Sequence, residues 1–102
     1  MPNTARRDDY CAMRKYIIER DIPGVGNLDA NALRGAAQQS NRALGECGPG
    51  IQWLESYATA DKTFCVYLAE NEDLIREHAK RSGFPATKIT EVKAVFDPST
   101  GH

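Results

Sequence analysis

The carboxylate of Glu55 lies between two aromatic residues in a segment with the composition of a β-strand. Alternation along a strand predicts that Trp53, Glu55 and Tyr57 share one face. Burying a carboxylate there is costly unless it is paired, binds a metal or carries a proton. Further along, His78 lies on the apolar stripe of a predicted helix. If the fold brings His78 over that face, the side chains form one polar group able to bind a metal or transfer a proton.

The elements that must position these residues follow the order β-α-β-β-α-β. Apolar periodicity, capping residues and turn signals predict strands at 14–20, 51–59, 63–69 and 88–96, and helices after the N-caps Asp29 and Asn71. This order is typical of the ferredoxin-like α+β fold, a four-stranded antiparallel sheet with two helices on one face. Because 64–69 is apolar on both faces, we expect the open face of the sheet to be covered. A second copy in a symmetric dimer is the simplest cover.

The turn around 60–62 decides which residue lies beside Glu55. A slip of one residue exchanges the two faces of a strand. Glu55 is therefore expected to share a face with either Tyr67 or Val66, and the sequence leaves both pairings open.

Length and charge limit the classes of function. A chain of 102 residues with net charge -1 is expected to form one domain, over 13–98, with a flexible extension at 1–12 and a loose tail at 99–102. The charge offers no attraction for nucleic acid or an anionic membrane, so neither is expected as a partner. The odd number of cysteines, 3, and the lack of a CxxC pair favour a reducing compartment, so we expect the cytoplasm.

Several segments resemble a known family. They include Gln52-Trp53-Leu54-Glu55-Ser56-Tyr57, Ile75-Arg76-Glu77-His78-Ala79 and Gly83-Phe84-Pro85-Ala86. With 15–24, 61–67 and 91–98, they are similar to small ferredoxin-like proteins described as nickel-binding, long classed as a domain of unknown function. The resemblance runs from about Met13 to Thr100. It implies a homodimer with a capacity for divalent nickel and an architecture similar to the dimeric α+β barrel proteins.

Candidate metal ligands follow from the chemistry of nickel(II), which imidazole and carboxylate groups suit. The sequence has 2 histidines, and only His78 falls within a predicted element. His78, Glu55 and Glu19 are therefore the predicted ligands, across the sheet or the dimer axis. No HExxH or closed zinc pattern is present. The favoured function is binding of nickel or a similar divalent ion, for sequestration or sensing, without catalysis.

Two alternatives stay open. In the first, the chain is a small-molecule-binding protein or a monooxygenase- or isomerase-like enzyme of the dimeric α+β barrel type. Glu55 would be the base, with its pKa raised in a dry cavity, while His78 relays the proton and Tyr57 orients the substrate. In the second, the chain is a purely structural dimer. His78 is then a core histidine that donates to a backbone carbonyl or a tyrosine, and Glu55 pairs with a basic residue.

Overall fold

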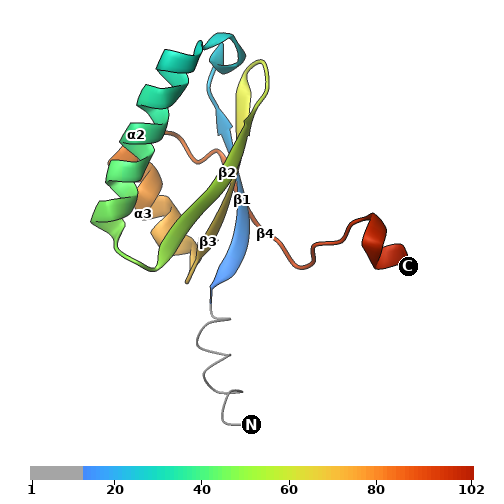
Figure 1. Cartoon of the computed structure of the whole chain (residues 1–102). Helices are drawn as coiled ribbons and strands as arrows, with labels where there is room; N and C mark the ends of the chain where they lie inside the picture. The colour runs from blue at the N-terminus through green and yellow to red at the C-terminus, as the bar shows by residue number, and fades with distance from the viewer. Residues whose placement is uncertain (1–12) are drawn as a thin grey trace.

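A single antiparallel sheet, covered on one face by two long helices, forms the body of the protein (Figure 1). The computed structural model describes residues 13–102, so the extension expected at 1–12 lies outside the described residues. The strands run in the spatial order β2-β3-β1-β4, with antiparallel neighbours. The elements are β1 (Arg14–Asp21), η1 (Val25–Asn27), α2 (Ala30–Cys47), β2 (Ile51–Ala58), β3 (Lys62–Ala69), α3 (Glu72–Ser82), β4 (Lys88–Glu91) and η2 (Pro98–Gly101). The predicted ferredoxin-like α+β fold is confirmed.

Both long helices begin at the predicted capping residues. The side chain of Asp29 accepts a hydrogen bond from the backbone N–H of Ala32 at 2.8 Å, and Asn71 accepts from Leu74 at 3.0 Å. Each cap satisfies one of the N–H groups that a helix leaves free in its first turn. At the other end of α3, Gly83 adopts a left-handed conformation with φ of 81°, which glycine takes without strain.

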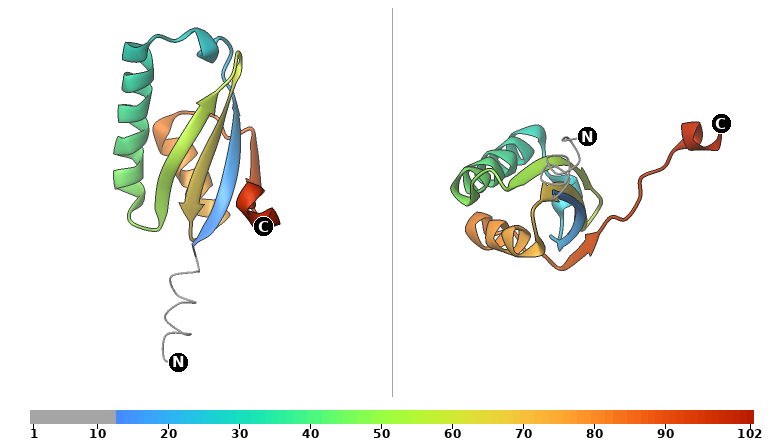
Figure 2. Two further views of the ribbon diagram at one scale, coloured as in Figure 1. Left: turned by 45° about the vertical axis from the view of Figure 1, so that its right-hand side comes forward. Right: turned by 90° about the horizontal axis from the view of Figure 1, so that it is seen from below.

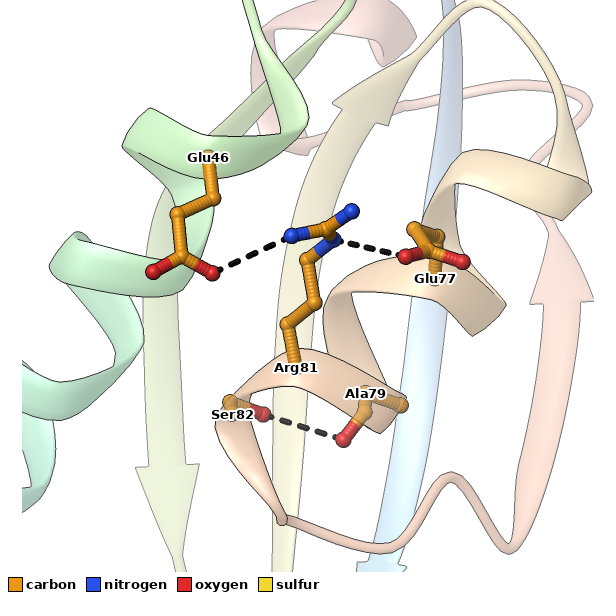
Figure 3. Close-up of polar contacts among 5 residues, drawn as sticks. All are labelled: Glu46, Glu77, Ala79, Arg81 and Ser82. Atoms are coloured by element: carbon orange, nitrogen blue, oxygen red, sulfur yellow. Dashed lines mark hydrogen bonds and ion pairs between the residues drawn. The ribbon is translucent and has the colours of Figure 1, made fainter.

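The core lies between the sheet and the helices. Its buried members are Tyr16, Ile18, Ile51, Cys65, Tyr67, Ala69 and Ile75. From α2 only Ser40 and Ala43 are buried, and these small side chains let the helix approach closely. Arg81 joins the helices on the outside, because its guanidinium contacts Glu77 of α3 and Glu46 of α2 at 2.6 and 3.3 Å (Figure 3).

The last strand is shorter than predicted. The sequence indicated a strand over 88–96, but β4 ends at Glu91, followed by one further hydrogen bond from Val92 N to Lys15 O at 2.8 Å. In this register Lys93 would lie opposite Arg14, where β1 begins, so the described residues offer no strand beside 94–96. Residues 92–102, named the arm here, leave the sheet on the side opposite the helices (Figure 2).

The arm carries two exposed apolar side chains and a short helix. Val95 is 71% exposed and Phe96 is 80% exposed. Asp97 accepts a hydrogen bond from Ser99 N at 2.9 Å, which holds the start of η2 in the region expected to form a loose tail. The hydroxyl of Ser99 donates to the same carboxylate, and these two hydrogen bonds, that of the hydroxyl above all, lower the pKa of Asp97 below its usual value.

Candidate functional site

A β-bulge at Leu54 decides which residues meet on each face of the sheet. Trp53 pairs with Tyr67 and Glu55 pairs with Val66, so Leu54 is an extra residue without a partner. An extra residue breaks the alternation of a strand, and the side chains on either side of it then point to opposite faces. The prediction that Trp53 shares a face with Glu55 and Tyr57 is therefore wrong for Trp53.

The indole of Trp53 lies on the helix face of the sheet. Its ring stacks on Tyr67, with ring centroids 6.5 Å apart. Its N–H donates to Ser56 Oγ at 2.9 Å, which confirms that Trp53 and Ser56 share this face beyond the bulge. The two aromatics that flank Glu55 in the sequence consequently do not enclose it.

Glu55 lies on the open face, the face without helices. Its pairing with Val66 answers the question that the sequence left open. Tyr57 lies on the same face, and its hydroxyl donates a hydrogen bond to Glu55 Oε2. That hydrogen bond, together with the carboxylate charge, raises the pKa of Tyr57 above its ordinary value. Both side chains are exposed, so this pair is an accessible acceptor group rather than a base in a dry cavity.

Glu19 is the second carboxylate on the open face. It lies opposite Phe64, two positions along β3 from the Val66 that pairs with Glu55. Glu19 and Glu55 are two strands apart across the sheet and two residues apart along it, so their Cα atoms are separated by roughly 12 Å. Lys62 approaches Glu19 to 3.7 Å and Asp21 to 3.3 Å. Over residues 13–102 no three His, Cys, Asp or Glu side chains group closely enough to hold a metal ion.

His78 is on the other side of the sheet from both carboxylates. It is fully buried, and its Nε2 lies 3.2 Å from both the carbonyl oxygen and Oγ of Ser40. As a donor to that carbonyl, it matches the alternative prediction of a core histidine. Burial lowers its pKa below the ordinary value, with the nearby Arg20 charge acting in the same direction. The structure thus unites Glu55 with Tyr57 and places Glu19 on their face, but it separates His78 from all of them.

A buried polar group that the sequence analysis missed surrounds His78. We call it the polar cluster, and its members are Arg20, Ser40, Tyr67 and His78. The guanidinium of Arg20, which is 2% exposed, donates from Nη1 to Pro85 O at 2.8 Å and lies 5.9 Å from the ring centroid of Tyr67. The tyrosine and imidazole rings are 5.3 Å apart. Burial raises the pKa of Tyr67.

Arg20 has no carboxylate within salt-bridge distance anywhere in the described part of the chain. Backbone carbonyls and the tyrosine therefore take the place of a counter-ion. The sequence did contain a signal for the burial of Arg20. Arg20 follows Ile18 by two positions and Tyr16 by four, and alternation along a strand places all three on the same face. The cluster connects β1, β3, both helices and the loop after α3.

A hollow of about 360 Å³ lies on the open face. The sheet contributes its floor through Lys15, Ile17, Glu55 and Val66, and the arm forms its wall through Val92, Ala94, Val95 and Phe96. Of the residues predicted for a site, only Glu55 lines this hollow. None of the helices in residues 13–102 has the length and apolar character needed to cross a membrane.

Comparison with known proteins points to one family. The family model described as "Nickel responsive protein SCO4226-like" matches residues 16–92, which include both long helices, β2, β3, β4 and all but the first two residues of β1. The crystal structure of SCO4226 from Streptomyces coelicolor A3(2) superposes with a TM-score of 0.68 at 14% identity, covering 80% of this chain and 99% of that one. At this identity the likeness shows the fold. Among curated proteins, none matches the chain.

Proposed function

Because the chain belongs to the SCO4226-like family of nickel-responsive proteins, we propose that it binds nickel or a similar divalent ion, for sequestration or sensing, as a homodimer. The family match carries this proposal. The exposed carboxylates of the open face support it, since nickel(II) accepts oxygen ligands.

The donors of one chain suggest where the ion would bind. The described residues of a single subunit hold no ready group of three metal-binding side chains, so the proposal takes donors from two chains. Glu55 and Glu19 remain the proposed ligands because both lie on the open face, where a second copy can approach. His78 is withdrawn as a ligand, since it is fully buried and engaged with Ser40.

The cysteines are consistent with a reducing compartment, and the proposal places the protein in the cytoplasm. Cys65 is buried and Cys47 is half-buried, and both are free thiols. Burial raises the pKa of the Cys47 thiol, which favours the unreactive protonated form.

The enzyme alternative is weakened by the same geometry. It needs a proton relay from Glu55 to His78, and the sheet lies between these side chains. It also needs a carboxylate enclosed by Trp53 and Tyr57, whereas Trp53 faces the helices. What remains is an exposed Glu55–Tyr57 pair, which suits ligand binding better than general base catalysis.

Calorimetric titration of nickel into the purified protein tests the proposal. The variants are Glu55→Gln, Glu19→Gln and the double variant, with Asp73→Asn as a control for loss of one exposed carboxylate. His102 is deleted throughout, so that its exposed imidazole adds no binding. We expect each single variant to weaken binding by about tenfold or more, a difference of about 1.4 kcal/mol, and the control to bind as the parent does.

The outcomes separate function from ligand assignment. If the parent protein gives no heat above that of buffer, the nickel-binding proposal is wrong. If the double variant binds as tightly as the parent, the proposed ligands are wrong and nickel binding stands. We expect His78→Ala to lower stability without abolishing the heat of binding.

A further inference from the structure

The arm and the open face are two apolar surfaces that the described part of the chain leaves uncovered. On the open face, Ile17, Phe64, Val66 and Leu68 are only half-buried, although they come from the two central strands. On the arm, Val95 and Phe96 are the most exposed large apolar side chains in residues 13–102. Central strands usually have both faces covered, and no part of residues 13–102 covers this face.

The arm of the same chain forms one side of the hollow but does not fill it. Val95 and Phe96 line the hollow beside the sheet, yet they remain 71% and 80% exposed, and the arm then runs away from the body (Figure 2). The hollow between the arm and the sheet has a volume of about 360 Å³. Among residues 13–102, its floor is therefore free for a second segment with an apolar surface.

The charges of the arm complement those of the floor. Lys15 and Glu55 line the hollow, one of each sign. The arm has the same two signs on either side of its apolar residues, in Lys93 and Asp97. The side chain of Lys93 is 82% exposed, and within residues 13–102 its one ion pair is with Glu91, at 3.4 Å, so its ammonium is accessible to a partner. Opposite charges that flank an apolar contact fix its orientation and register.

We propose that the arm of each chain docks in the hollow of a second copy, so that two copies exchange arms. Each copy supplies both the apolar arm and the apolar floor, and a two-fold axis brings both pairs together at once. Phe96 and Val95 cover the partner's Ile17 and Val66, while Lys93 and Asp97 approach the partner's Glu55 and Lys15. This inference rests on the homodimer of the proposed function, and its test needs no nickel.

Light scattering after size-exclusion chromatography tests the exchange through Phe96→Asp. The matched control is Leu33→Asp, which places the same charge on an apolar residue of α2 that is 44% exposed, on the other side of the sheet. The wild type should elute at twice the chain mass of 11.3 kDa. Phe96→Asp should raise the dimer dissociation constant at least about 30-fold, as for a central interface residue. Leu33→Asp should remain dimeric.

Other outcomes distinguish the two proposals. A monomeric wild type overturns both the homodimer and the arm exchange, and nickel titration then tests metal binding separately. A dimer of Phe96→Asp as tight as that of the wild type overturns the arm exchange alone and leaves the homodimer in place.

A cross-linking experiment tells exchange from folding back. One tagged chain carries Lys15→Cys, a second carries Asp97→Cys, and the two are refolded together and oxidised gently. A disulfide between positions 15 and 97 of different chains, identified by peptide mass spectrometry, supports the exchange. A control chain carries both Lys15→Cys and Asp97→Cys. If this chain forms the disulfide internally while the mixed single variants form none between chains, the exchange is overturned.

Discussion

Glu55 and His78 lie on opposite faces of one sheet, with β3 between them. Glu55 is beside Val66 on the open face, and His78 packs on Tyr67 on the helix face. The two residues with the most promising chemistry in the sequence therefore serve different purposes. His78 belongs to the interior, and Glu55 is available to a ligand or a second chain.

Replacing Arg20 with alanine should destabilise the fold. The change removes the donor to Pro85 O and the cation beside Tyr67, leaving buried polar atoms without partners. The free energy of unfolding should fall by about 3 kcal/mol, as measured by urea denaturation. Arg42→Ala, at an exposed position of α2, should change it by less than about 0.5 kcal/mol. Equal losses in the two variants would contradict the role given to Arg20.

Stability should depend on pH through His78. Burial lowers the pKa of His78 in the folded state, whereas in the unfolded chain the imidazole takes up a proton at about pH 6.5. Just below that pH the unfolded chain binds more protons, so stability is complete above it and falls as the pH is lowered towards the folded pKa. Thermal melting of the wild type and of His78→Phe between about pH 8 and 5 measures this. Parallel curves for the two proteins would rule out His78 as the cause.

Glu55→Gln should lower the pKa of Tyr57. The hydrogen bond and negative charge of Glu55 hold the phenol protonated, and the amide removes that charge. Ultraviolet titration of the phenolate follows the change, with Tyr57→Phe used to assign the signal. An unchanged titration curve in Glu55→Gln would show that the two side chains do not interact in solution.

Two glycine substitutions should have opposite signs. A Cβ at Gly26 would lie 2.5 Å from the backbone oxygen of Thr59, so Gly26→Ala must push η1 away from the turn between β2 and β3. At Gly35, within α2, a Cβ meets nothing within 4 Å. We expect Gly26→Ala to cost about 1–3 kcal/mol and Gly35→Ala to stabilise by about 0.5–1 kcal/mol in chemical denaturation. Destabilisation by Gly35→Ala would contradict the open environment.

The order of elements could be predicted because its signals are local. Asp29 and Asn71 cap the helices where the sequence placed them, and Gly83 ends α3. The end of β4 could not be read from its own residues. Val95 and Phe96 have high strand propensity, but the length of β1, a distant segment, decides how far β4 can pair.

The site was harder to predict because it depends on the bulge. Leu54 is neither glycine nor proline and resembles any apolar strand residue. Its place in the bulge depends on the packing of Trp53 against Tyr67, which are distant in sequence. Arg20 was missed for a related reason, because its partners are the carbonyls of Phe84 and Pro85 in a distant loop.

The bulge at Leu54 also affects how this protein is compared with its relatives. A strand of the same length in which Leu54 paired regularly would place Glu55 on the face of Trp53, in the interior. Glutamates that align at this position are therefore equivalent only where the strand reaches them in the same register. Loss of the bulge with Leu54 retained would move a carboxylate from the surface to the core without any substitution.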